Sequence, residues 1–164
     1  MTANPEARDE ARPGPDVAAP VGVAAGAAGA SPLVLVADDD EDSRTIAVIT
    51  LRHAGYRVVE ARTGPEAVAA ARALRPALVL MDVSMPELDG WAATRLLKAD
   101  AATRGVLVLA HTAHAGADDE ARSAEAGCDG HLPKQVEPQR LVREVARALA
   151  LGITGAGAPR AEPA

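Results

Sequence analysis

The sequence has almost no aromatic residues and only one cysteine. Among its 164 residues there is no phenylalanine, one tryptophan (Trp91) and one tyrosine (Tyr56). A hydrophobic core must therefore be built from alanine, valine, leucine and isoleucine, and no set of aromatic rings is available on which bases could stack. Cys128 has no partner for an intrachain disulfide, and no zinc-type spacing of cysteine and histidine is present. These absences favour a reducing compartment, the cytoplasm, with Cys128 as a small buried core residue.

The chain also lacks an excess of positive charge and a long hydrophobic run. Its formal net charge of -6 at pH 7 gives no electrostatic reason to bind nucleic acid, which requires clustered lysine and arginine. The segment that most resembles a targeting signal, residues 17–30, lacks leucine, isoleucine and phenylalanine, contains Pro20, and follows a net negative flank. It suits neither a signal peptide nor a membrane helix. We therefore expect no nucleic acid and no membrane as partners.

Both ends of the sequence are rich in alanine, glycine and proline and show no apolar periodicity. Segments of this composition cannot bury enough surface to offset the entropy of ordering them. We expect residues 1–31 and 152–164 to be disordered tails and residues 32–151 to form one domain, which is an ordinary domain size.

Within residues 32–151, short apolar runs alternate with stretches that have helical spacing. The runs span residues 33–37, 56–60, 77–81, 106–110 and, more weakly, 130–132. Alternation of this kind is the signature of βαβ units around a parallel sheet. The sequence therefore predicts a doubly wound α/β domain with five parallel strands and interleaved helices.

The helical spacing is clearest near the end, where Leu141, Val145 and Leu149 recur on one face. Other helices are expected at residues 42–54, which precede Gly55 as a C-terminal cap, at residues 64–74, which begin beside Pro65, and at residues 117–126. The apolar face of residues 117–126 contains only alanines. We therefore expect this helix to be held loosely and to be the most mobile of the set.

Polar residues that can carry chemistry follow the apolar runs, where the functional site of an open parallel sheet lies. They are several carboxylates, one hydroxyl and one ammonium: Asp38 to Asp42, Asp82, Thr112 and Lys134. Crowded carboxylates repel one another, and their hard oxygens suit Mg2+. With that cation and Lys134 in place, the charge of a transferring phosphoryl group can be neutralised while Asp82 acts as the nucleophile. The residues predict a phosphoryl-acceptor site.

Four segments, residues 35–44, 78–90, 110–114 and 130–134, resemble the receiver domains of two-component response regulators, in that family's order and spacing. The resemblance covers about residues 33–150. It implies a stand-alone, CheY-like receiver with a flavodoxin-like (βα)5 fold and strand order 2-1-3-4-5. It also implies phosphorylation by a histidine kinase or phosphotransfer protein, and an output to an unknown protein target without independent turnover of a substrate.

The same resemblance implies a role for each residue of the site. Asp82 would be the phosphorylated residue, and Thr112 and Lys134 would bind the phosphoryl oxygens. Mg2+ would be held by Asp82, by Asp39 and by the main-chain carbonyl of Ser84, with Asp38 contributing through water. In the loop after the acceptor, Pro86 and Gly90 match residues that set the backbone angles.

Two residues depart from the family's pattern. Gln135 replaces the proline that usually follows the lysine through a cis peptide bond, which leaves both isomers of the Lys134–Gln135 bond open. His131 replaces the switch aromatic residue and could turn inward behind Thr112. Family knowledge further assigns Ser84 and His114 an influence on the lifetime of the phosphoryl group.

Simpler interpretations compete with some of these assignments. Aspartates at a helix start often serve as caps, and we expect only that of Asp40 and Asp42. We expect Trp91 to cover the core with its ring, and His53 and His111 to be surface or packing residues. Two alternative functions remain: a degenerate receiver that acts as a binding module, and a phosphatase of the haloacid-dehalogenase type with Asp38 as its nucleophile.

Overall fold

The computed structural model describes residues 31–114 and 116–154, in which strands and helices alternate. The elements are β1 (Leu33–Ala37), α1 (Glu41–His53), β2 (Arg57–Ala61), α2 (Gly64–Leu74), β3 (Leu78–Asp82), α3 (Gly90–Ala99), β4 (Leu107–Thr112), α4 (Ala117–Ala126), β5 (Gly130–Pro133) and α5 (Pro138–Thr154). The segment at residues 17–30 and most of both expected tails lie outside the described residues. At the C-terminal end, α5 continues past the expected boundary at residue 151. Within the described ranges, no helix is long and apolar enough to cross a membrane.

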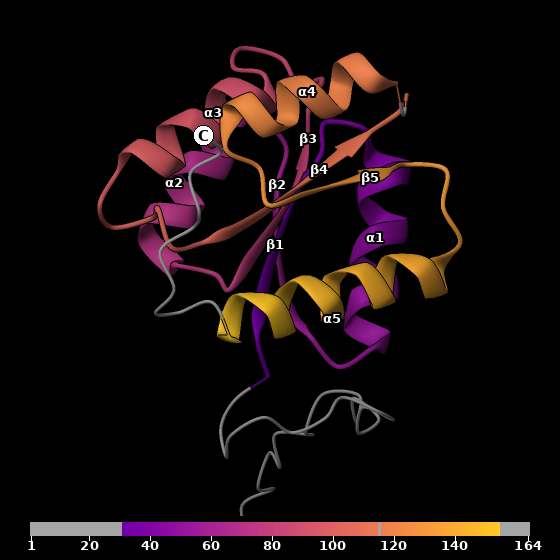
Figure 1. Cartoon of the computed structure of the whole chain (residues 1–164). Coiled ribbons are helices and arrows are strands. Elements are labelled where there is room, and N and C mark those ends of the chain that lie inside the picture. Colours follow the sequence, from indigo (N-terminus) through magenta and orange to yellow (C-terminus); the bar gives the residue numbers. More distant parts are fainter. Residues whose placement is uncertain (1–30, 115, 155–164) are drawn as a thin grey trace, which may run out of the picture.

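The five strands form one parallel sheet in the order β2-β1-β3-β4-β5, which confirms the predicted topology. Helices α1 and α5 cover one face of the sheet, and α2, α3 and α4 cover the other (Figure 1). The central strands β1 and β3 are shielded on both faces and are almost entirely apolar, as parallel strands between two helical layers must be. Polar side chains of the central strands can therefore reach solvent only at the ends of the strands.

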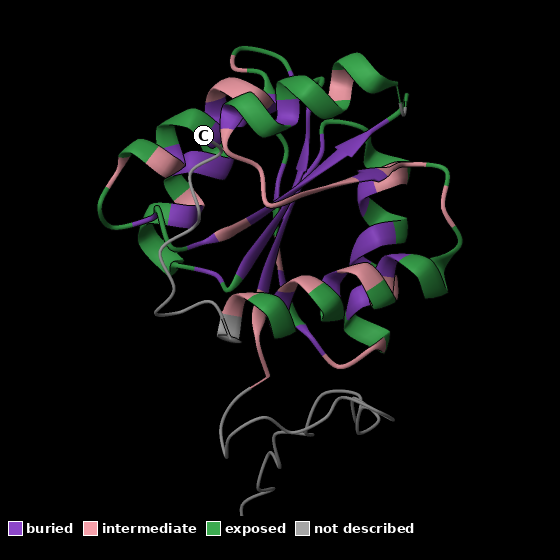
Figure 2. Ribbon diagram, viewed as in Figure 1, coloured by how far each residue is buried: buried purple, intermediate pink, exposed green. Residues whose placement is uncertain are grey.

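The core has two layers, one on each face of the sheet. One layer packs β-strand side chains against α1 and α5 and includes Leu51, Leu80 and Val145, and the other packs them against α2 and α3 and includes Met81 and Leu97. Figure 2 shows the sheet buried and the outer faces of the helices exposed. No aromatic side chain other than Tyr56 belongs to either layer, which agrees with the composition.

Strand boundaries differ from the expected runs by one or two residues, because hydrogen bonding and not hydrophobicity decides them. Tyr56 was expected to begin β2, but its N–H donates to the carbonyl of Leu51 and closes the end of α1. The N–H of Val106 likewise bonds to Thr103 in the turn before β4. At the other ends, Asp82 and Thr112, which were expected to follow the apolar runs, are the last residues of β3 and β4.

The helix ends follow the predicted chemistry. The side chain of Asp40 caps α1 by accepting a hydrogen bond of 2.7 Å from the N–H of Ser43, and Gly55 adopts the left-handed conformation (φ 98°) just beyond the helix. Helix α4 has no side-chain cap and buries only Ser123 and Ala126. Its mobility stays a prediction.

Two expectations about packing were wrong. Trp91 does not join either core layer. Its indole Nε1–H donates to Oγ of Ser123 at 3.2 Å, and Arg122 lies 5.2 Å from the ring centre, so the side chain joins α3 to α4. Cys128 is only partly buried, and it packs against the layer beneath α3.

Candidate functional site

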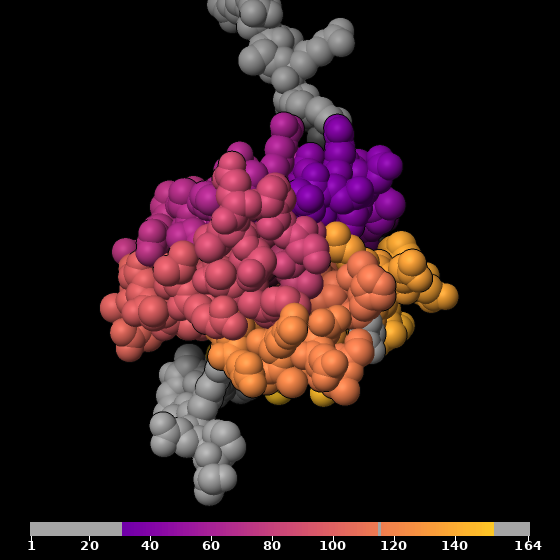
Figure 3. Space-filling model, turned by 90° about the horizontal axis from the view of Figure 1, so that it is seen from above, coloured from indigo at the N-terminus to yellow at the C-terminus, as the bar shows by residue number. Residues whose placement is uncertain are grey.

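Sheet register places two carboxylates side by side at the carboxyl edge of the sheet. Ala37 pairs with Met81, so Asp38 and Asp82, which follow them directly, lie next to each other on neighbouring strands. Both residues are 1% exposed. Figure 3 views the molecule from this edge, where the indigo start of α1 lies beside the segment that follows β3.

Lys134 links these two carboxylates. Its Nζ lies 3.0 Å from Oδ2 of Asp38 and 3.1 Å from Oδ2 of Asp82, and it donates a hydrogen bond to Oδ1 of Asp38. The main-chain N–H of Lys134 donates to the carbonyl of Thr112 at 2.6 Å, which fastens the end of β5 to β4. The convergence that the sequence predicted is therefore present for Asp38, Asp82 and Lys134.

The carboxylates of Asp38, Asp39 and Asp82 fit a divalent cation. One oxygen from each lies within 4.8 Å of the others, and Asp39 is exposed while its two neighbours are buried. Oδ2 of Asp38 and Oδ2 of Asp82 are buried, and in the described part of the chain each faces the ammonium group of Lys134 as an ion pair and has no further hydrogen-bond donor. Three carboxylates and one ammonium group keep a net negative charge, and the hard carboxylate oxygens suit a cation such as Mg2+. The main-chain carbonyl of Ser84 as a further ligand stays a prediction.

Crowding separates the acidities of the two buried carboxylates. The pKa of Asp82 is raised to about 7, chiefly by burial and also by the negative charge of Asp38, although the Ser84 N–H and Lys134 act in the opposite direction. Burial also tends to raise the pKa of Asp38, but hydrogen bonds from Ser43, Lys134 and the Asp40 N–H lower it overall. Asp38 is therefore the more acidic of the pair, and a bound cation would favour ionised Asp82.

Thr112 lies at the end of β4, 1% exposed, and its hydroxyl has two partners. It donates to the main-chain carbonyl of His114, and its Oγ1 lies 2.8 Å from Nε2 of His131 on β5. His131 thus turns inward behind Thr112, as the sequence suggested. His114 is exposed. No peptide bond in residues 31–114 and 116–154 is cis, so the Lys134–Gln135 bond is trans.

The loop between β3 and α3 depends on a glycine for space. A Cβ atom on Gly90 would lie 2.1 Å from the main-chain oxygen of Asp82, and the Gly90 N–H donates to the carbonyl of Val83 at 3.0 Å. The expectation that Gly90 supplies an unusual backbone angle was wrong. The left-handed residue of this loop is Glu87, with φ 69°.

Sequence reasoning missed two residues of the site. Arg44 is 4% exposed, donates a hydrogen bond of 3.0 Å to the main-chain carbonyl of Asp38, and lies 3.8 Å from the carboxylate of Glu60. The sequence could have indicated Arg44, because it places a positive side chain one turn into the helix that follows the aspartates. His111 pairs with Asp82 in the sheet and is 5% exposed, and burial lowers its pKa to about 4. It is the packing residue we expected, but it lies directly beside Asp82.

Comparison with known proteins agrees with this geometry. The family model of the response regulator receiver domain matches residues 34–146. The polar-differentiation response regulator DivK of Brucella anthropi is 33% identical over 112 residues, which cover 68% of this chain and 91% of DivK.

Solved structures agree as well. Chemotaxis protein CheY4 of Vibrio cholerae matches with a TM-score of 0.70 and 28% identity, covering 73% of this chain and 99% of that one. The receiver domain of sensor histidine kinase PA1611 from Pseudomonas aeruginosa, which has a magnesium ion coordinated in its active-site cleft, matches with a TM-score of 0.69 and 33% identity, covering 74% of this chain and 99% of that one.

These matches support a signalling protein and not a metabolic enzyme, and they do not support the haloacid-dehalogenase alternative. The strand order, the paired carboxylates and the bridging lysine all lie within the matched residues. The chain belongs to the response regulator receiver domain family.

Proposed function

We propose that the chain is a single-domain response regulator whose Asp82 accepts a phosphoryl group from a histidine kinase or phosphotransfer protein. The observation that carries this proposal is the Lys134 ammonium group held between two buried carboxylates at the ends of β1 and β3. A carboxylate oxygen of Asp82 attacks phosphorus, the P–N bond of the phosphohistidine breaks, and the departing imidazole keeps the electron pair and takes up a proton.

Several residues around Asp82 would together neutralise the negative charge of the phosphoryl group. Asp39, Asp82 and the carbonyl of Ser84 would hold Mg2+, with Asp38 contributing through water. The bound cation would offset negative charge on the phosphoryl oxygens. Lys134 stays cationic because, although burial opposes it, the hydrogen bond and charge of Asp38 and the charge of Asp82 raise its pKa. The ammonium group of Lys134 would donate a hydrogen bond to one phosphoryl oxygen, and the hydroxyl group of Thr112 would donate to another.

Phosphorylation with a small-molecule donor tests the proposal. The chain is incubated with Mg2+ and phosphoramidate or acetyl phosphate, and intact mass is measured. We expect one phosphoryl adduct, lost in Asp82→Asn and retained in Asp40→Asn, which removes a nearby negative charge but keeps a side-chain oxygen that can cap α1. No adduct at Asp82 would contradict the proposal and favour the binding-module alternative, and a label on Asp38 would favour the phosphatase chemistry.

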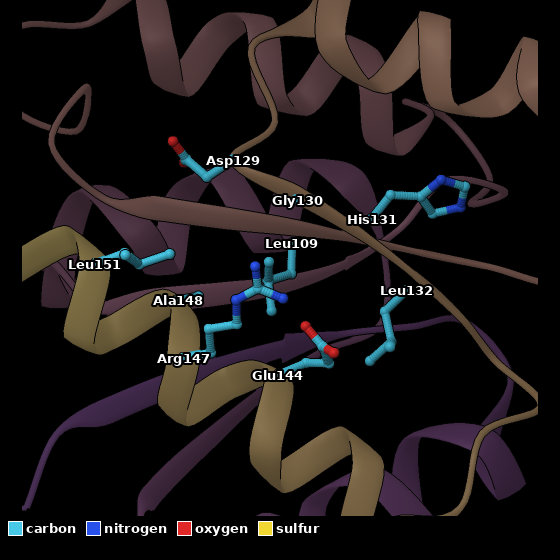
Figure 4. Close-up of a pocket in the computed structure, with 9 residues that line it drawn as sticks. All are labelled: Leu109, Asp129, Gly130, His131, Leu132, Glu144, Arg147, Ala148 and Leu151. Atoms are coloured by element: carbon cyan, nitrogen blue, oxygen red, sulfur yellow. The ribbon is translucent and has the colours of Figure 1, made fainter. Parts of the chain in front are cut away.

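We further propose that the signal leaves through the surface formed by α4, β5 and α5. A pocket of about 270 Å³ opens there between β4, β5 and α5. Its apolar lining includes Leu109, Leu132, Ala148 and Leu151, and the charged side chains of Glu144 and Arg147 also line it (Figure 4). A protein target in the cytoplasm would bind this surface. A pull-down with and without beryllofluoride, which mimics the phosphoryl group, tests whether binding depends on the state of Asp82.

A further inference from the structure

The hydroxyl group of Thr112 makes two contacts that together fix where its proton lies. One partner is the main-chain oxygen of His114, and the other is Nε2 of His131, at 2.8 Å. A hydroxyl has one proton to donate, and a carbonyl oxygen can only accept. The Thr112 proton therefore goes to His114. It follows that Nε2 of His131 carries a proton and donates it to Oγ1 of Thr112.

Strand geometry explains why His131 can make this contact. On β5, Leu132 belongs to the core layer beneath α1 and α5, and alternation directs its neighbour His131 to the opposite face of the sheet. Figure 4 shows the imidazole ring of His131 pointing away from Glu144 and Arg147 of α5. Since Ala110 pairs with His131, the ring reaches forward along β4 to the side chain of Thr112.

We propose that His131 is a positioning residue of the phosphoryl site, acting through Thr112. This inference rests on the function proposed above. To donate to a phosphoryl oxygen on Asp82, the Thr112 hydroxyl must leave the carbonyl of His114, because it has only one proton. His131 does not compete for that proton, since it donates to a lone pair of the same oxygen.

The hydrogen bond from His131 thus persists while the hydroxyl proton changes acceptor. It keeps Oγ1 of Thr112 in place at the end of β4 during the exchange. A hydroxyl that accepts a hydrogen bond is also a stronger donor, because hydrogen bonds in a chain polarise one another. A phenylalanine at position 131 would offer no such donor.

Two substitutions of His131 separate this role from packing. In His131→Gln the amide nitrogen is as many bonds from the backbone as Nε2, so it can still donate to Thr112. In His131→Asn the amide nitrogen occupies the place of Nδ1 and falls short. Phosphorylation of Asp82 by phosphoramidate is followed at saturating Mg2+ over a range of donor concentrations, with rapid quenching and intact mass as the readout.

We expect His131→Asn to lower the rate constant at saturating phosphoramidate by about fivefold to tenfold, which corresponds to one lost hydrogen bond. His131→Gln should stay within about twofold of the unsubstituted chain, given the same bond. The phosphoramidate concentration for half-saturation and the affinity for Mg2+ should not change in either variant, because the residues proposed to hold Mg2+ lie at the ends of β1 and β3 and not on β4 or β5.

Equal slowing of both variants would overturn the positioning role, since packing alone would then explain it. Equal and undiminished rates would overturn it as well. Absence of any adduct on Asp82 in the unsubstituted chain would instead overturn the proposed function, and the positioning role would fall with it.

A second measurement does not depend on phosphorylation. Nitrogen-15 NMR of histidine-labelled protein distinguishes a protonated from an unprotonated ring nitrogen. We expect Nε2 of His131 to be protonated, and its signal to shift in Thr112→Val, where the acceptor oxygen is absent. An unprotonated Nε2 would overturn the inference directly.

Discussion

The ammonium group of Lys134 lies 3.0 Å from Oδ2 of Asp38, a residue 96 positions earlier in the chain. It lies as close to Asp82, so one cation holds together carboxylates from β1 and β3 and draws the loop after β5 over them. Two buried carboxylates and one ammonium leave net negative charge at this edge of the sheet. That charge favours the binding of a divalent cation at this edge.

Replacing Lys134 with methionine should affect the binding of Mg2+ and of a phosphoryl mimic differently. Beryllofluoride, in the presence of Mg2+, should bind at least tenfold more weakly, since a charge-assisted hydrogen bond contributes about 1.5 to 3 kcal/mol. Mg2+ alone should bind at least as tightly as before, because a competing cation is gone. Calorimetric titration measures both affinities, with Arg143→Met on the exposed face of α5 as the control. An unchanged affinity for beryllofluoride would argue against Lys134 as a phosphoryl ligand.

Asp82→Asn should stabilise the metal-free protein at pH 8. Burial and the charge of Asp38 raise the folded-state pKa of Asp82 to about 7, so ionising it destabilises the fold. This contribution favours the folded state at low pH and is lost as pH rises through about 7. Removing the charge should raise the free energy of unfolding by about 1 to 3 kcal/mol. Urea denaturation with a chelator present measures the difference, and a variant that is less stable than the unsubstituted chain at pH 8 would contradict it.

His111 should make the protein sensitive to acid. Burial lowers its folded-state pKa to about 4 from an ordinary value of 6.5, so the unfolded chain binds the extra proton between these values. Stability from neutral His111 is therefore present above pH 6.5 and lost as pH falls toward 4. The free energy of unfolding of His111→Leu, relative to that of the unsubstituted chain, should be about 2 kcal/mol more favourable to the variant at pH 5 than at pH 7. Urea denaturation at the two pH values measures it. Exposed His53→Leu is the control, and an advantage that does not change with pH would refute the burial argument.

Gly90→Ala should damage both the fold and the site. Its Cβ atom would lie 2.1 Å from the main-chain oxygen of Asp82, so the backbone at Asp82 must move. We expect a loss of at least about 2 kcal/mol in the free energy of unfolding and weaker Mg2+ binding. Gly105→Ala is the matched control, since nothing lies within 4 Å of its added atom, and it should change stability by less than about 0.5 kcal/mol. Thermal and urea denaturation of both variants would decide the matter, and equal effects would show that space at Gly90 is not limiting.

Patterns that act locally were readable from the sequence. Apolar runs and helical spacing predicted the five strands and the named helices, because burial on both faces or on one stripe imposes those periods. The cap at Asp40 and the left-handed Gly55 follow from chemistry within a few residues. The placement of Asp38, Asp82 and Lys134 at one edge followed from the rule that parallel strands end together.

What the tertiary structure decided depends on register and on contacts between distant segments. The sequence shows His111 next to Thr112, but only strand pairing places it beside Asp82. The sequence shows Arg44 one turn into the helix after the aspartates but not that it bonds to the main-chain carbonyl of Asp38, and Gly90 is needed for space and not for its backbone angle. The donor role of His131 likewise emerges only where β5 lies against β4 and one hydroxyl proton must be shared between two neighbours. Sequence thus determined which residues gather at the site, and three-dimensional packing decided which of them touch, because hydrogen bonds and close approaches depend on distances of a few tenths of an ångström.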